Sequence, residues 1–157
     1  MKIPHAFRIV SLPREIAAAA RTSRLDAFGN EPVRVLDGGR HQCRQCLRLS
    51  QPGEPVLLIA HRPFSSRQPY AETGPVFVHE RDCESYPHIH AWPSGFPRDK
   101  VVLRAYDERE RIAGAQAVGG RRVEDVIDEM LNDEKIAFLH ARNLGYGCYM
   151  FRIERNW

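Results

Sequence analysis

The segment from Lys135 to Arg155 constrains the fold more than any other part of the chain. It holds two runs of alternating apolar and polar residues around a short break rich in Gly and Asn, which is typical of a β-hairpin. A three-residue loop at 143–145 would place three pairs opposite each other: Arg142 with Tyr146, His140 with Cys148, and Phe138 with Met150. The hairpin would then present a guanidinium, an imidazole and a thiol on one face.

Other alternating runs predict further strands. They are expected at residues 5–12, 43–49, 56–60, 74–79, 101–107 and 112–118. The turn sequence QPGE joins the second of these strands to the third, and DERER joins the last two, so two more hairpins are expected. The proline-rich segment that follows residue 80 is expected to form an irregular loop.

Two helices are expected, at about residues 13–27 and 122–132. Pro13 suits the first helical position and Glu15 complements the helix dipole. In the second helix the apolar residues fall at helical spacing: Val123, Val126, Ile127, Met130 and Leu131. The sequence therefore predicts an α+β fold, with a mainly antiparallel sheet of short strands and hairpins and two helices.

Length and composition are those of a soluble globular chain. The 157 residues suit a single domain spanning residues 1–157, and 43% of them are apolar. Among the 23 basic residues, all except Lys2, Lys100 and Lys135 are arginines, but they are scattered and are matched by 20 acidic residues. A nucleic-acid-binding module would concentrate its basic residues, so we expect no nucleic-acid partner.

The N-terminal residues show no continuous apolar run of the kind expected in a secretion signal. Polar and charged residues interrupt the apolar ones, and no stretch approaches the length of a membrane span. We therefore expect a cytoplasmic protein with no membrane partner. In that compartment its four cysteines should be reduced rather than paired in disulfides.

Four segments occur in an order that resembles a known family. They are CRQCLRLSQPGE, YAETGPVFVHERDC, LRAYDERERIAGA and IAFLHARNLGYGCYMFRIER. Together they resemble the domain of unknown function 1203 family, over about residues 43–155. The resemblance implies a small, uncharacterised bacterial protein and no particular activity, so function must be argued from the residues.

The first functional hypothesis is a binding or accessory module for a small polar or anionic ligand. Its pocket would lie at the C-terminal hairpin and would be lined by Arg142, Asn143, Arg44, Arg104 and Tyr106. Arginine binds oxyanions in a bidentate manner, and tyrosine adds a donor on an apolar ring. The alternative is that these arginines are exposed strand residues that protect the sheet edges from pairing.

The second hypothesis is a small enzyme for acyl-type transfer. Cys148 would be the nucleophile and His140, opposite it in the expected register, would be the base. Arg142, Asn143 or the backbone of residues 145–147 would stabilise the developing oxyanion.

The third hypothesis is a zinc-binding domain, built on the two-residue gap between Cys43 and Cys46. His41, His79, Cys83, His88 and His90 could complete the ligand set. However, the alternation around Cys43 predicts a strand, on which residues three apart point to opposite faces. We therefore expect no metal, and the sequence predicts no particular cofactor; if a metal binds, its expected ligands are Cys43, Cys46, Cys83 and His88.

Overall fold

The computed structural model describes residues 6–87 and 89–156 of the chain, and within these ranges it contains eight strands and two helices. In chain order they are β1 (Phe7–Val10), α1 (Arg14–Ser23), β2 (Val33–Val35), β3 (Val56–His61), β4 (Gly74–His79), β5 (Val101–Tyr106), β6 (Ile112–Ala117), α2 (Val123–Leu131), β7 (Phe138–Asn143) and β8 (Tyr149–Arg155). All strand pairings between these elements are antiparallel, which confirms the α+β prediction. Neither described helix has the length and hydrophobicity that a membrane span requires.

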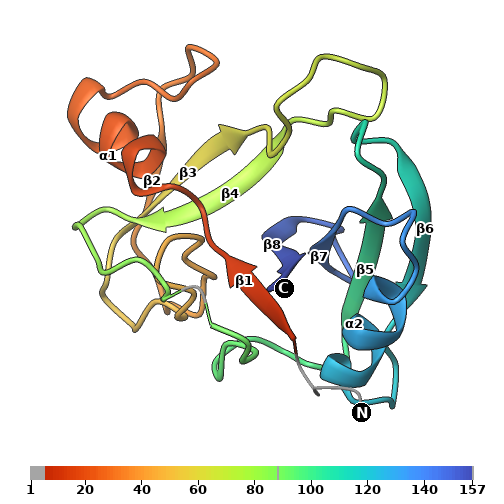
Figure 1. Ribbon diagram of the computed structural model, residues 1–157. Coiled ribbons are helices and arrows are strands. Elements are labelled where there is room, and N and C mark those ends of the chain that lie inside the picture. Colours follow the sequence, from red (N-terminus) through yellow and green to blue (C-terminus); the bar gives the residue numbers. More distant parts are fainter. Residues whose placement is uncertain (1–5, 88, 157) are drawn as a thin grey trace.

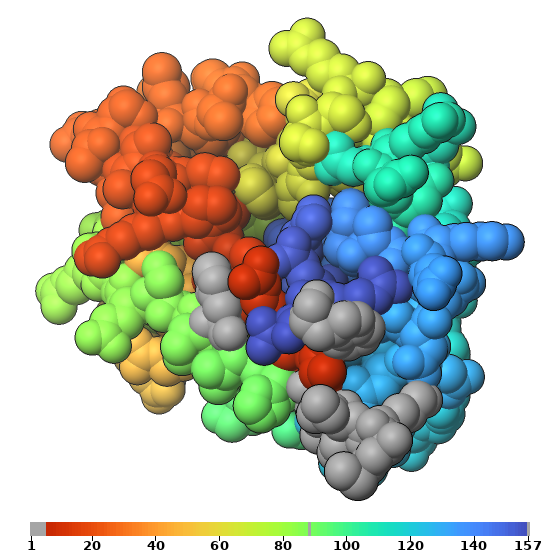
Figure 2. All heavy atoms as spheres, viewed as in Figure 1, coloured from red at the N-terminus to blue at the C-terminus, as the bar shows by residue number. Residues whose placement is uncertain are grey.

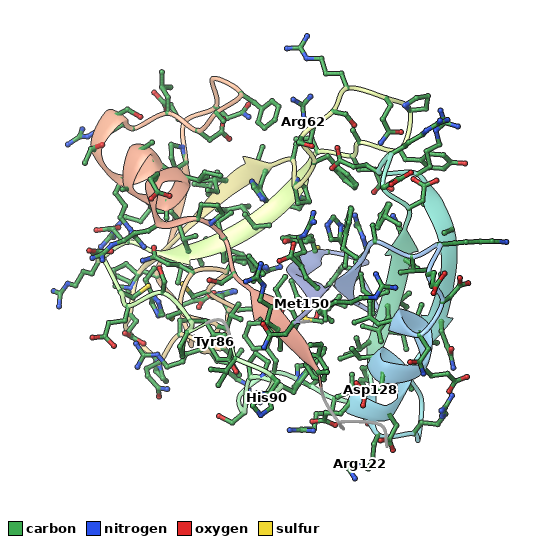
Figure 3. All side chains as sticks on the ribbon, viewed as in Figure 1. Arg62, Tyr86, His90, Arg122, Asp128 and Met150 are labelled. Atoms are coloured by element: carbon green, nitrogen blue, oxygen red, sulfur yellow. The ribbon has the colours of Figure 1, made fainter. Side chains whose placement is uncertain are left out.

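Sheet A has five strands in the order β1-β8-β7-β5-β6, and α2 covers one of its faces (Figure 1). The odd-numbered residues of β5 and β7, and those of β8 from Phe151 onward, point toward α2, where Leu103, Leu139 and Ile153 are fully buried. They pack in one cluster with Val126 and Ile127, two of the residues in the predicted apolar stripe of α2. Met150 lies in the same cluster, and Figure 3 labels it in the interior of the molecule.

Sheet B has three strands in the order β2-β3-β4 and packs against α1 (Figure 1). Small residues of α1, Ala17 and Ala20, allow the helix to lie close to Leu57 and Val78 of the sheet. Tyr149, at the start of β8, belongs to this second cluster, so sheet B meets the C-terminal hairpin at this residue.

Residues 62–73, called here the 62–73 segment, connect β3 to β4 and lie over the second face of sheet A. Figures 1 and 2 show this yellow-green segment reaching the turn between β5 and β6 at the top of the molecule, and Figure 3 labels Arg62 at its start. Glu110 of that turn accepts hydrogen bonds from the backbone N–H groups of Ser65 and Ser66. This anchor holds the segment above the polar face of sheet A.

Three local predictions are wrong. Residues 43–49 form a turn rather than a strand, and β3 pairs with β2 and β4 instead. The first helix ends at Ser23 because Arg24 adopts a left-handed conformation, so it is shorter than predicted. In the C-terminal hairpin Phe138 pairs with Glu154 and His140 pairs with Arg152, four residues beyond the expected partners.

Candidate functional site

The second face of sheet A carries polar side chains in place of a regular apolar surface. Even-numbered residues of three adjacent strands meet there: Arg104 on β5, His140 on β7 and Arg152 on β8 lie side by side in the register. His140 has no exposed surface, and four aromatic rings surround it at centroid distances of 4.8–5.1 Å: Phe64, Tyr106, Phe138 and Tyr149. This face is a buried polar layer under the 62–73 segment.

A cavity of about 400 Å³, called here the hairpin pocket, opens beside this layer. It lies where the C-terminal hairpin meets β3 and the start of β4. Its lining residues are His61, Pro63, Glu72, Thr73, Gly74, Pro75, Arg142, Tyr146, Gly147, Cys148 and Tyr149. The volume falls within the range of small-molecule sites.

Arg142 is the basic side chain of the pocket, and only 9% of it is exposed. Its Nη1 donates a hydrogen bond of 3.0 Å to the carbonyl oxygen of Gly147. The same nitrogen lies 3.6 Å from a carboxylate oxygen of Glu72, which is beyond hydrogen-bonding distance. Its Nε is buried and has no hydrogen-bond partner in the described chain. The guanidinium therefore lines a cavity with unused donors.

Glu72 connects Arg142 to Arg104. One of its carboxylate oxygens accepts a hydrogen bond of 2.7 Å from Nη1 of Arg104, and the other faces Arg142. Glu72 is the one acidic side chain among the residues that line the hairpin pocket, and it is half exposed. A single carboxylate is thus shared between two guanidinium groups.

Arg44 is buried behind the pocket and has carbonyl partners. Its Nε donates to the carbonyl oxygen of Tyr149 at 2.7 Å, and its Nη1 donates to that of Gln42. Burial, opposed in part by the Cys148 and Cys43 thiols, lowers the pKa of Arg44 to about 10, so the side chain still carries its charge at neutral pH.

Both histidines near the pocket are held neutral. Burial, followed by the charge of Arg44, lowers the pKa of His61 to about 4. Burial, followed by Arg142, Arg152 and Arg104, lowers the pKa of His140 to about 2. The same cations that depress these two pKa values favour an anion in the neighbouring space.

Two other residues predicted to line the pocket, Asn143 and Tyr106, have side chains that make contacts elsewhere in the fold. The side-chain amides of Asn143 and Gln42 exchange two hydrogen bonds, at 2.8 and 3.0 Å. Tyr106 is fully buried and its ring stacks on Phe138, outside the lining of the pocket. Of the five predicted ligand-binding residues, Arg142 alone lines the cavity.

Cys148 and His140 are not opposite each other, because the register places Arg152 across from His140. Cys148 instead lines the hairpin pocket together with His61, from sheet B. The expected cross-strand contact is therefore wrong, whereas the thiol does lie at a cavity.

A second group of chemical interest, called here the thiol cluster, consists of Cys43, Cys46, His79 and Cys83. Their ligand atoms all lie within 4.8 Å of one another. Three of the four residues are buried, and Cys83 is partly exposed. The structure thus brings together three of the four ligands expected for a metal; the fourth, His88, lies outside the described residues, and His79 completes the set.

Sequence reasoning missed His61 and Glu72 as pocket residues. Both come from sheet B or its connecting segment, and nothing in their local sequence indicates that they lie against the C-terminal hairpin. The sequence indicates the role of His79 more clearly than those of His61 and Glu72, because His79 precedes Cys83 by four residues at the end of an expected strand.

Comparisons with known proteins identify the chain at the level of a family. A family model described as "Protein of unknown function (DUF1203)" matches residues 40–155. Neither the curated proteins nor the solved structures include a match to the chain. The matched range contains the whole hairpin pocket and all four residues of the thiol cluster.

Proposed function

Because the chain belongs to this family of unknown function, we propose its function from the pocket itself: the protein binds a small molecule with a carboxylate or phosphate group in the hairpin pocket. One observation carries the proposal. The guanidinium of Arg142 is over nine-tenths buried, lines the cavity and has a buried Nε with no partner in the described chain. Leaving such a donor unsatisfied costs about 1–3 kcal/mol, and an oxyanion would supply the acceptor.

The charges around the pocket support an anion rather than a cation. Arg142 and Arg104 share Glu72, and Arg44 is hydrogen-bonded to carbonyl oxygens. The positive charges nearby therefore exceed the one acidic group that lines the cavity. In a partly buried site of low dielectric, this excess attracts an oxyanion more strongly than the same charges would in water.

Glu72 sets the position that the ligand would take. Its carboxylate is bonded to Arg104 and only approaches Arg142, so the Nε and second Nη of Arg142 remain for the ligand. His61, neutral at pH 7, can donate or accept one hydrogen bond beside it. The ligand would thus be held by one charged, bidentate contact and one neutral contact.

A thermal-shift screen of the purified protein tests this proposal. Acetate, oxalate, succinate, inorganic phosphate and phosphoserine are each titrated into the protein, up to at least ten times the dissociation constant that the titration gives. At that ratio a bound ligand stabilises the fold by about 1.4 kcal/mol, which raises Tm by about 3–6 °C in a chain of this size. Amide chemical shifts of Gly147 and Cys148 in a ¹⁵N-labelled sample then locate the ligand.

The variant Arg142→Gln is expected to abolish the Tm shift, while Arg142→Lys retains charge and loses the bidentate contact. The exposed Arg109→Gln variant is the matched control and should respond like the parent chain. A panel without any Tm shift, or an equal shift in the Arg142→Gln variant, would refute the proposal.

A second candidate, a thiol enzyme for acyl-type transfer, is favoured by the position of Cys148. This residue and His61 line the same pocket, with Arg142 available to an oxyanion. The pKa of about 4 makes His61 a weak base at neutral pH, so ligand binding is the better-supported function. Faster alkylation of Cys148 by iodoacetamide than of a free thiol, abolished in a His61→Phe variant, would favour the enzyme.

A further inference from the structure

The thiol cluster draws together three separate parts of the chain. Cys43 and Cys46 come from the turn between β2 and β3, His79 is the last residue of β4, and Cys83 follows it in the next loop. Sγ of Cys43 lies 3.8 Å from Sγ of Cys83, and Sγ of Cys46 lies 3.5 Å from Nδ1 of His79. We propose that these four residues bind one zinc ion.

Two separations within the cluster are those of a tetrahedral zinc site, and all four ligand atoms lie within 4.8 Å of one another. With zinc–sulfur bonds of about 2.3 Å, two sulfurs on one ion lie about 3.8 Å apart, and a sulfur and an imidazole nitrogen lie about 3.6 Å apart. The two measured separations, 3.8 and 3.5 Å, match both values. A disulfide would instead bring two sulfurs to about 2.05 Å, so the cluster has the spacing of ligands and not of a bonded pair.

The backbone of the turn determines where Cys43 and Cys46 lie. On the strand that the sequence predicts, their side chains would point to opposite faces. The N–H of Leu47 donates to the carbonyl oxygen of Cys43 at 3.0 Å, and Leu47 adopts a left-handed φ of 56°. This tight turn brings Cys43 and Cys46 to the same side. The backbone N–H of His79 lies 3.4 Å from Sγ of Cys43, a contact that stabilises a thiolate.

The charges around the cluster suit a zinc tristhiolate. Three thiolates, one neutral imidazole and Zn²⁺ carry a net charge of −1. Nη2 of Arg21 lies 4.0 Å from Sγ of Cys83 and offsets that charge. The Nε2 of His79 is buried without a hydrogen-bond partner in the described chain, and it lies 3.7 Å from a carboxylate oxygen of Glu54, beyond hydrogen-bonding distance.

The donor set identifies both the metal and its role. Three cysteine sulfurs and one histidine nitrogen are a usual ligand set of structural zinc, while magnesium and calcium require oxygen. All four positions come from the protein, and Cys43, Cys46 and His79 are each less than 9% exposed. A closed site of this kind has no open position for a substrate, so the ion would stabilise the junction of the turn, β4 and the following loop.

Metal analysis of the intact protein, purified without chelators from cells supplied with zinc, tests the proposal. Plasma mass spectrometry should find close to one equivalent of zinc, and the same value in the Cys148→Ser variant, which removes the cysteine outside the cluster. Cys83→Ser and His79→Phe should lower the zinc content at least several-fold. The His79→Cys variant should retain the zinc that His79→Phe loses, because four thiolates also bind zinc.

Cobalt substitution tests the coordination geometry independently of the zinc content. Co²⁺ in the refolded protein should give the intense visible absorption of a tetrahedral thiolate site, and the band should move when His79 is replaced by cysteine. Zinc below about a tenth of an equivalent, with four freely titratable thiols, would overturn the proposal. Full zinc content in the Cys83→Ser variant, or loss of zinc in Cys148→Ser, would overturn it as well.

Discussion

The guanidinium of Arg44 donates a hydrogen bond of 2.7 Å to the carbonyl oxygen of Tyr149, across 105 residues of chain. Arg44 lies between the two cysteines of the turn, and Tyr149 begins β8 and lines the hairpin pocket. This single side chain therefore connects the thiol cluster to the C-terminal hairpin. Its backbone takes part too, since the N–H of Arg44 donates to the carbonyl oxygen of Phe77.

Replacing Arg44 with lysine should destabilise the fold. An ammonium group cannot satisfy both the Tyr149 and the Gln42 carbonyl oxygens, and one buried acceptor left unpaired costs about 1–3 kcal/mol. Urea unfolding of the Arg44→Lys variant measures this loss. The exposed Arg109→Lys change should stay within about 0.5 kcal/mol. Equal stability of the two variants would show that the bond to Tyr149 is dispensable.

Acid should destabilise the protein through His140. Its pKa is lowered to about 2 in the folded state, against about 6.5 in the unfolded chain, so the unfolded state binds more protons below pH 6.5. This contribution to stability is complete above pH 6.5 and falls as the pH drops, by about 2 kcal/mol between pH 7 and pH 5.

A His140→Phe variant should lack this component, because phenylalanine fits the same aromatic surroundings and does not titrate. Urea unfolding at pH 7 and pH 5 provides the comparison, with the exposed His90→Gln variant as control. An unchanged pH dependence in His140→Phe would contradict the assignment.

Loss of the Glu110 carboxylate should loosen the 62–73 segment. Burial raises the pKa of Glu110, but hydrogen bonds from Ser66 and Ser65 outweigh burial and leave the pKa below its usual value. The Glu110→Ala variant should therefore expose the amides of Ser65 and Ser66 to faster hydrogen exchange. It should also weaken ligand binding in the hairpin pocket, since Glu72 lies on this segment. Unaltered exchange of both amides would count against the anchor.

Two adjacent glycines should differ sharply in their tolerance of alanine. Gly39 has a φ of 85°, and a Cβ there would lie 2.6 Å from the backbone carbon of Gln51. A Cβ added to Gly38 would have no atom within 4 Å. Gly39→Ala should cost at least about 1–2 kcal/mol from its left-handed conformation alone, and the backbone contact adds to this. Gly38→Ala should be close to neutral, so a similar loss in both variants would refute the structural reason given for Gly39.

Local sequence patterns were sufficient to predict the elements that depend mainly on residues close in sequence. The β5–β6 hairpin and α2 appear where the alternation and the apolar stripe predict them. Residues 43–49 show the opposite case. Their alternation is typical of a strand, but the turn there depends on contacts with Phe77 and His79 of β4, which are distant in sequence. A pattern read along the chain does not contain those contacts.

The candidate sites show the same limit. Arg142 and Cys148 were predicted to share a pocket and both line it, because they belong to one hairpin. His61 and Glu72 complete that pocket from sheet B, so their role depends on how the two sheets pack. The thiol cluster similarly requires the turn at Cys43 to meet the end of β4. The sequence correctly suggested Cys43, Cys46 and Cys83 as members of one ligand set. It predicted a strand between Cys43 and Cys46, where the structure has a turn.

The four-residue difference between the expected and observed partners in the C-terminal hairpin left every even-numbered side chain of β7 on the side where alternation had put it. At Phe138 and His140 the displacement is even, so one strand slides along the other without turning over; at Arg142, which pairs with Tyr149, a one-residue bulge makes the displacement three. The bulge absorbs the odd residue beside the loop, so the side chains farther along β7 and β8 keep their faces. A single residue inserted without a bulge between Phe138 and His140 would exchange the two faces of β7 and turn His140 away from its aromatic neighbours toward the apolar cluster beside α2.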